Sequence, residues 1–245
     1  MYMKGDDPRE TLNEVLRNIH GSLKWYWQVV MGLSMVKAVD NFYVFLFEGK
    51  PPPSTRDIAE FSSLFVVFLL IFIRFYFGDS RYLDEHYIEY RRWRPIPEYL
   101  EDIPRKISKQ RTYLDVVMLM IIAILFVFMA KSLSHSTIFF ATYFTLLVIN
   151  IIWLSFTIYL NSNQRPTDIV KQERYDAPRI WIINNFIHSL LMLSFLLPVL
   201  SINHSVQRIA LLVLCVTNSI VDFMLTSSYY FPKLDASHAQ RLRGD

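Results

Sequence analysis

The chain has 245 residues, of which 53% are hydrophobic and 16% aromatic, and its formal net charge is +3. This apolar content exceeds what a soluble domain normally carries, so we expect part of the surface to face something other than water. The single cysteine, Cys215, excludes a disulfide within the chain and any cysteine-based zinc or iron–sulfur site, and we predict that it is a small buried hydrophobe.

Residues 1–24 predict a short amphipathic helix on the cytoplasmic surface of a membrane. Asp7 is a candidate N-cap, Pro8 suits the first helical position, and apolar residues recur at helical spacing from Leu12 to Ile19. The segment lacks the basic-then-apolar pattern of a secretory signal, so we expect it to stay on the mature protein.

Six apolar segments follow, each close to the ~20 residues that a helix needs to cross a membrane. Strands of a membrane β-barrel would be about half as long and would alternate polar and apolar residues, which these segments do not. The sequence therefore predicts an all-α polytopic membrane protein with six transmembrane helices arranged as three hairpins. The predicted spans cover about residues 25–47, 58–78, 113–131, 138–160, 180–202 and 207–230.

Positive charges predict the orientation of these spans. Nineteen of the 25 Lys and Arg residues precede the first span, lie between spans two and three or four and five, or follow the sixth. Because cytoplasmic connections carry an excess of positive charge, we predict that both termini lie in the cytoplasm, and we assign the protein to the cytoplasmic (inner) membrane. The six-helix domain would then cover 25–231, and a cytoplasmic tail 232–245.

The first span carries two opposite charges, Lys37 and Asp40, near its predicted centre. Ionisable groups at that depth cost ~2.5–3.5 kcal/mol each on insertion scales, so they normally face a protein interior. Ser34 and Asn41 extend the same helix face. We predict that this face points to an interior within one subunit or between subunits. Whether Lys37 pairs with Asp40 or crosses the bundle to Asp222 remains open at this point.

The cytoplasmic connection 79–112 is the longest polar segment, with seven acidic and eight basic residues. Arg91, Arg92 and Arg94 surround Trp93, and we predict that this cluster contacts anionic lipid headgroups or a cytoplasmic protein partner. The interspersed acidic residues argue against nucleic-acid binding. The run Asp84–His86 predicts a solvated helix face because no second His or Cys lies at ligand spacing, so neither a metal site nor a cofactor is predicted.

The other spans contain further polar residues at comparable depths. Arg74 lies four residues before Gly78, and we expect its side chain to snorkel to the inner interface. The ends of spans two, four and six resemble one another weakly, and this alignment makes Arg74 and Asp222 a candidate pair. The predicted intramembrane polar residues are Lys37, Asp40, Asn41, Arg74, Asn150, Asn184, His188, Asn218 and Asp222.

Two interpretations of these polar residues compete. They either form hydrogen bonds and ion pairs that fix helix rotation, or line a cytoplasm-facing pathway for protons, ions or a small polar solute. We favour an oligomeric channel or transporter, with membrane lipids and further copies of the chain as partners. The alternatives are a non-catalytic sensor or docking subunit that binds a cytoplasmic partner, and an intramembrane lipid-modifying enzyme with Asp222 and His188 as its acid–base pair. The sequence has no P-loop, Gly-x-Ser-x-Gly or HExxH motif, which ranks the enzyme last.

Overall fold

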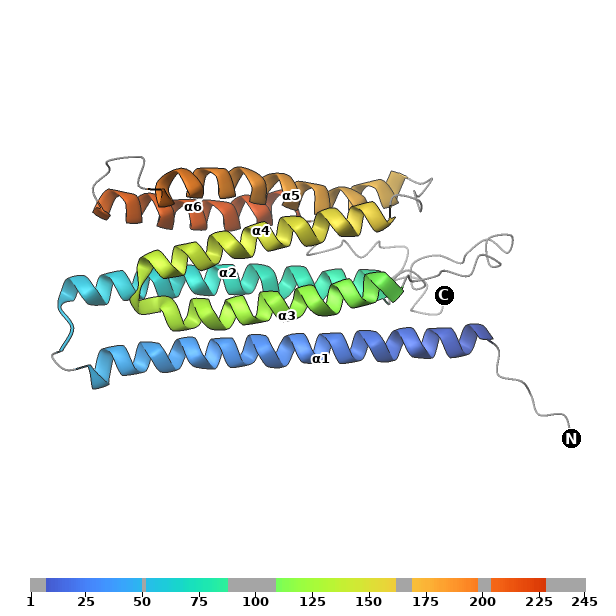
Figure 1. Cartoon of the computed structure of the whole chain (residues 1–245), viewed down its shortest axis with the longest axis horizontal. Coiled ribbons are helices and arrows are strands. Elements are labelled where there is room, and N and C mark those ends of the chain that lie inside the picture. The colour runs from blue at the N-terminus through green and yellow to red at the C-terminus, as the bar shows by residue number, and fades with distance from the viewer. Residues whose placement is uncertain (1–7, 50–51, 88–108, 162–168, 198–203, 228–245) are drawn as a thin grey trace, which may run out of the picture.

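The structure is a computed structural model that describes residues 8–49, 52–87, 109–161, 169–197 and 204–227. All regular secondary structure in these ranges is helical (Figure 1). A π-helical turn, η1 (Val44–Glu48), extends α1, and a 3-10 turn, η4 (Ser132–Ser134), joins α3 to α4. The six long helices are α1 (Pro8–Tyr43), α2 (Thr55–Tyr87), α3 (Lys109–Lys131), α4 (Ser136–Asn161), α5 (Ile169–Leu196) and α6 (His204–Leu225).

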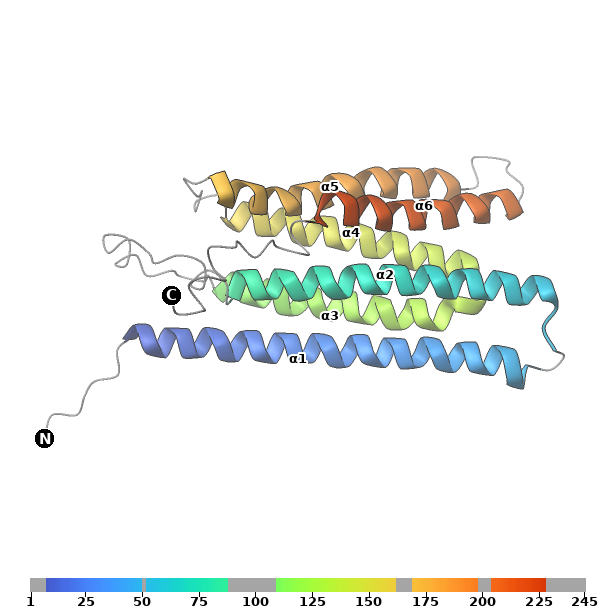
Figure 2. The same cartoon turned by 180° about the vertical axis from the view of Figure 1, so that it is seen from behind.

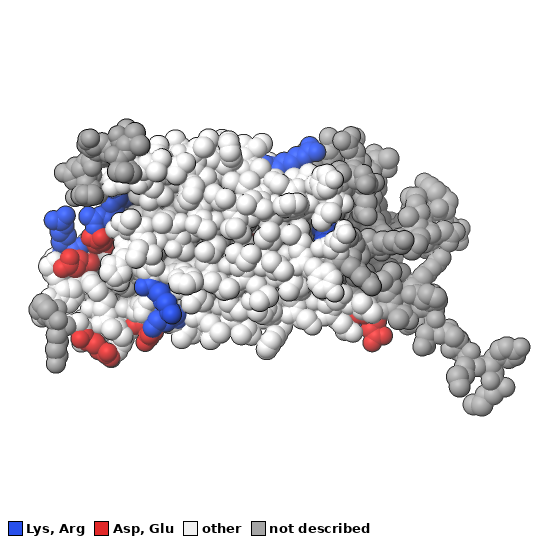
Figure 3. All heavy atoms as spheres, viewed as in Figure 1, with Lys and Arg blue, Asp and Glu red and all other residues white. Residues whose placement is uncertain are grey.

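All six helices are long and apolar enough to cross a membrane. Large apolar side chains also lie on the outside of the bundle, including Val36 at 66% exposure and Phe47 at 72%. On the face shown in Figure 3, most charged side chains gather toward the two ends of the bundle. The prediction of an all-α integral membrane protein with six candidate spans is thus confirmed for the described part of the chain.

The first helix differs from the predicted one. α1 runs without a break through its 36 residues, so the N-terminal amphipathic segment and the first span form one helix rather than two elements. At ~1.5 Å per residue this helix measures about 54 Å, well beyond the ~30 Å hydrocarbon core. No proline interrupts α1 after Pro8, which explains why the helix does not end at residue 24.

Consecutive helices run in opposite directions, so that α1 begins and α6 ends toward the same end of the bundle (Figures 1 and 2). We call this end the terminal end. The main packing partners form a closed ring in the order α1, α2, α6, α5, α4, α3 and back to α1. Only 17% of the most apolar stretch of α1 is buried, against 28–44% for the other five helices. α1 is therefore the helix that its neighbours cover least.

Aromatic side chains fill the space between α1, α2 and α3. The ring of Phe126 lies at the centre, with ring centroids 5.6–6.5 Å from those of Trp27, Phe68, Phe72 and Phe75. All four contacts are edge-on, which is a favourable geometry for aromatic pairs. This half of the ring of helices is therefore packed mainly with apolar side chains, and most of the buried polar residues lie on α2, α4, α5 and α6.

Candidate functional site

A buried ion pair joins α2 to α6. Arg74 Nε lies 3.0 Å from Asp222 Oδ2, and the two side chains are 4% and 0% exposed. α2 continues past Gly78 to Tyr87, about 20 Å beyond Arg74. The expected snorkelling of Arg74 to the interface is therefore wrong: the helix does not end near Gly78, and Asp222 supplies a closer counter-charge.

Asparagine side chains extend this ion pair toward α4 and α5. Arg74 Nη2 donates to Asn185 Oδ1 at 2.5 Å, and Asn185 Nδ2 donates to Asn150 Oδ1 at 3.2 Å. Asn185 and Asp222 are fully buried, and Asn150 is 7% exposed. The guanidinium is thus held by groups on two helices besides its own, which satisfies donors that would be costly to leave unpaired in the membrane.

A second branch returns to α6 through a tyrosine. Arg74 Nη1 lies 3.5 Å from the hydroxyl of Tyr143, which also accepts a 2.8 Å hydrogen bond from Asn218 Nδ2. Asn218 Oδ1 in turn accepts from Asn184 Nδ2 at 2.6 Å. These contacts link α2, α4, α5 and α6 into one set, which we call the polar network. Its members are Arg74, Tyr143, Asn150, Asn184, Asn185, Asn218 and Asp222.

A small cavity of about 20 Å³ lies against the polar network. Its volume suits about one water molecule. One further charged residue lines it: Asp79, which is 5% exposed and whose Oδ2 has no hydrogen-bond partner among the described residues. Asp79 lies within electrostatic reach of Arg74, so one guanidinium faces two carboxylates. The lining residues are Arg74, Phe75, Gly78, Asp79, Asn150, Trp181 and Asp222.

A second buried carboxylate, Asp115, lies closer to the terminal end. Its Oδ1 accepts hydrogen bonds from the Tyr82 hydroxyl and from Trp153 Nε1, both at 2.9 Å, and its Oδ2 accepts one from the Tyr87 hydroxyl at 2.8 Å. Burial and the negative charge of Asp115 raise the pKa of Tyr87, so this hydroxyl keeps the proton that it donates. We call these residues the Asp115 cage, which ties α3 to α2 and α4.

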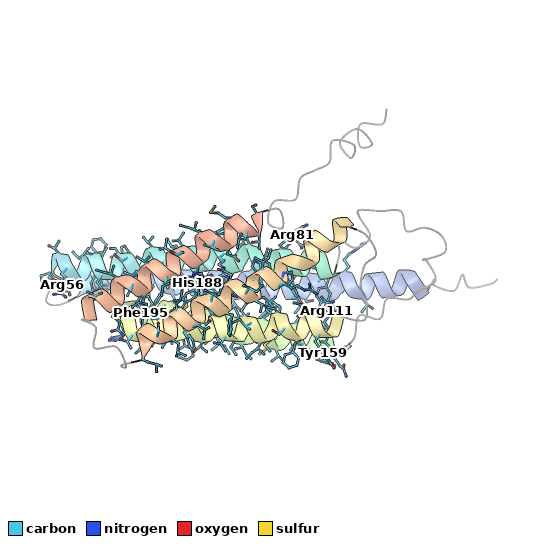
Figure 4. The ribbon with its side chains drawn as sticks, turned by 90° about the horizontal axis from the view of Figure 1, so that it is seen from above. Arg56, Arg81, Arg111, Tyr159, His188 and Phe195 are labelled. Atoms are coloured by element: carbon cyan, nitrogen blue, oxygen red, sulfur yellow. The ribbon has the colours of Figure 1, made fainter. Side chains whose placement is uncertain are left out.

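Depth separates the Asp115 cage from the polar network. Tyr82 follows Arg74 by eight residues on α2, which is about 12 Å along the helix axis. Figure 4 shows Arg81, Arg111 and Tyr159 toward the terminal end, Arg56 at the opposite end, and His188 between them. Buried polar groups therefore continue from the terminal end to the middle of the bundle.

Lys37 and Asp40 do not join the polar network. Lys37 Nζ lies 2.6 Å from Asp40 Oδ2, and the side chains are 39% and 52% exposed on the outside of α1. The prediction that both point into an interior is wrong within one chain. Asn41 also lies outside the network, since its amide donates to the backbone oxygen of Ala130 at 2.8 Å.

The contact between Asn41 and Ala130 explains how the exposed charges are tolerated. Ala130 is the residue before the end of α3, and Lys37 lies only four residues, about 6 Å, from Asn41 along α1. The pair therefore lies close to the level at which α3 ends, and a lysine side chain can reach a membrane surface over that distance. Lys37 therefore lies toward this end of the bundle rather than at the predicted midplane, because α1 and η1 continue to Glu48, past the level at which α3 ends at Lys131.

His188 and Asp222 do not form the expected acid–base pair. His188 Nδ1 lies 2.9 Å from the carbonyl oxygen of Asn184 on its own helix, whereas Asp222 faces Arg74. His188 is therefore a neighbour of the polar network, and among the described residues no carboxylate pairs with its ring to orient it.

The predicted surface features have mixed outcomes. Asp84 is not simply solvated: it is 27% exposed and accepts contacts from His20 at 2.8 Å and Lys24 at 2.7 Å, which tie α1 to α2. The basic and aromatic cluster of Arg91, Arg92, Trp93 and Arg94 lies outside the described residues.

The structure thus brings together five of the nine predicted intramembrane polar residues: Arg74, Asn150, Asn184, Asn218 and Asp222. Three residues of the site were not predicted from the sequence: Tyr143, Asp79 and Asp115. Tyr143 is one of 14 tyrosines and carries no distinguishing signal. Asp79 and Asp115 were overlooked because they lie at the edges of their apolar segments, where an acidic residue suggests a solvated helix end.

Comparisons with protein-family models, with curated proteins and with solved structures found no match for this chain.

Proposed function

We propose that the protein is a membrane transporter that moves protons or a small polar solute, with the Arg74–Asp222 pair as its closed gate. The observation that supports this proposal is the complete burial of that pair inside a network drawn from four helices. Burying two ions costs several kcal/mol of desolvation for each, and apolar side chains of similar volume often stabilise a protein as well or better. A charged pair at this position therefore favours a role that needs the charge.

The distribution of polar groups supports a path that is closed toward one side. From the terminal end, the Asp115 cage, Asp79 and the polar network follow one another toward the middle of the bundle. One turn beyond Tyr143, Phe139 and Phe140 are buried and pack edge to face with ring centroids 5.6 Å apart. This arrangement is typical of an occluded state that would open toward the terminal end when the ion pair separates.

The proposal includes the arrangement of the chain in the membrane. The helices form three hairpins in the cytoplasmic (inner) membrane. Both termini lie in the cytoplasm, so the terminal end of the bundle is the cytoplasmic end. The chain forms homo-oligomers through α1, whose outer face is the least covered and carries the exposed pair Lys37 and Asp40. An interface there would remove these charges from contact with lipid.

The other two classes of function have less support. A lipid-modifying enzyme would need an acid–base pair, and His188 and Asp222 have different partners. A docking subunit would use the 79–112 connection, most of which lies outside the described residues.

Ion flux in reconstituted vesicles tests the transporter proposal. A pH gradient is imposed across vesicles that contain the purified protein, and the internal pH is followed with a trapped dye. We expect wild type to dissipate the gradient and Asp222→Asn to lose at least nine-tenths of that rate. The double variant Lys37→Ala/Asp40→Ala is the matched control because it removes a charge pair outside the network, and it should keep the wild-type rate.

Two results would reject a gate. The first is flux that is equal in wild type and Asp222→Asn. The second is an absence of flux for protons and for common small ions, combined with a loss of stability in the Asp222→Asn variant, which would show that the pair is structural.

A further inference from the structure

The gate pair leaves one buried charge without a role. Arg74 and Asp222 compensate each other, and the amides and hydroxyl of the network surround them. Asp79 lies on the same helix as Arg74 and lines the same cavity, and its Oδ2 has no hydrogen-bond partner among the described residues. A carboxylate that is only 5% exposed and unpartnered at one oxygen calls for a further ligand.

The charged groups around Asp79 identify that ligand by charge balance. Arg74 on α2 is the cation within electrostatic reach of Asp79, and it already forms an ion pair with Asp222 on α6. His188 on α5 also lies within electrostatic reach of Arg74. If Arg74, Asp79 and Asp222 are all ionised, the cavity holds one negative charge in excess. An uncompensated charge is costly in the membrane interior.

Three basic residues toward the terminal end act on carboxylates other than Asp79. On α3, Arg111 acts on Asp115, whose carboxylate is held in the Asp115 cage. On α1, Lys24 and His20 contact Asp84, which follows Asp79 by five residues. A metal cation in the cavity would be repelled by the positive charge of the Arg74 guanidinium beside it, and the volume is only about 20 Å³. A proton is therefore the cation that fits.

We propose that Asp79 is the proton-binding residue of this cavity. A hydronium ion that reaches the cavity from the terminal end gives its proton to Asp79 Oδ2, which forms a neutral carboxylic acid and leaves one water molecule behind. Release reverses the same step. Asp79 then has two states. When it is neutral, Asp222 is the ionised carboxylate that pairs with Arg74 among the described residues; when it is ionised, Asp79 and Asp222 compete for Arg74.

This competition connects proton binding to the gate. A proton on Asp79 leaves the Arg74–Asp222 pair uncontested and so stabilises the closed arrangement. Loss of the proton weakens the pair because Asp79 attracts the same guanidinium. The inference rests on the proposed function only in this last step, since proton binding by Asp79 can be measured without any flux.

Infrared difference spectroscopy during a pH titration tests the proton site directly. The purified full-length protein is titrated, and the carbonyl stretch of protonated carboxylic acids is followed. We expect the Asp79→Asn variant to lose one titrating band that wild type shows. Asp84→Asn is the matched control: it removes a carboxylate from the terminal end of the same helix, and the band should persist.

The variants distinguish the possible failures. Asp79→Glu keeps a carboxyl group and should shift the band, which guards against a loss of signal caused by misfolding of Asp79→Asn. If Asp79→Asn keeps every band of wild type, the proton site is refuted, whatever the flux. If the band is lost but wild type shows no flux, the site stands and the transporter proposal fails. Flux that depends on Asp222 and is unchanged in Asp79→Asn would refute the connection to the gate.

Discussion

Removal of the Asp222 carboxylate should destabilise the protein by an amount that depends on Asp79. Breaking a buried ion pair by removing one partner costs about 3–5 kcal/mol. In the Asp222→Asn variant, Arg74 keeps its contacts with Asn185 and Tyr143 and can use Asp79 as a counter-ion. We therefore expect a loss near the lower limit, about 3 kcal/mol.

The companion variants give this prediction its sharpest form. Asp79→Asn alone should change the free energy of unfolding by less than about 1 kcal/mol, because it removes a carboxylate with an unpartnered oxygen. The double variant Asp79→Asn/Asp222→Asn removes both carboxylates that act on Arg74 among the described residues and should lose about 5 kcal/mol. The double-variant cycle then yields a coupling of at least about 1 kcal/mol between residues 79 and 222.

Unfolding in mixed detergent micelles measures these differences. The denaturing detergent is titrated, and helix content and tryptophan fluorescence report the transition. Strict additivity in the cycle would show that Asp79 and Asp222 do not share Arg74. A loss below about 0.6 kcal/mol for Asp222→Asn would match an average interhelical hydrogen bond in a membrane and would refute a buried ion pair.

Three further predictions concern the groups outside the gate. In micelles that hold single copies of the chain, Lys37→Ala/Asp40→Ala should stay within about 0.5 kcal/mol of wild type in the same titration, because the pair is exposed on one chain and contributes little. A loss above about 2 kcal/mol in such micelles would show that the pair is buried within the chain. Asp115→Asn should lower the free energy of unfolding by about 1–3 kcal/mol, because this carboxylate accepts hydrogen bonds from several buried donors. Tyr82→Phe should lower it less, because the hydroxyl supplies only one of them. Unchanged stability in both variants would show that the Asp115 cage is dispensable. Asp84→Asn should speed hydrogen exchange near the terminal end of α1, measured by mass spectrometry, because it weakens the contacts of Asp84 with Lys24 and His20. Equal exchange rates would show that these contacts do not hold α1 against α2.

The residues of the site were largely visible in the sequence, but of their partners only the candidate pair of Arg74 and Asp222 was, and the structure confirms it. Polar residues within apolar segments stand out by composition, and five of the nine named this way belong to the polar network. The partner of Lys37 could not be predicted, because on charge alone either Asp40 or Asp222 could pair with it. The structure gives Asp222 to Arg74 because α2 packs against α6, whereas α1 packs against α2 and α3.

Depth in the membrane was the other quantity that the sequence misjudged. The apolar pattern gave Lys37 a central position and Arg74 a position near an interface. The structure reverses the two, because α1 extends past the end of α3 and α2 continues to Tyr87. The depth of a residue depends on where the neighbouring helices end, and one segment's own hydropathy does not report that.

The sequence by itself determined the class and the number of spans, because length and hydropathy are local properties and each helix satisfies its own backbone hydrogen bonds. It also determined which side chains are costly to place in a membrane. Only the tertiary structure decided which of those side chains are buried together, since helix rotation and packing order set that outcome. It put Asp79 beside a pair that needs no second carboxylate, and it left Lys37 and Asp40 to each other on the outside of α1.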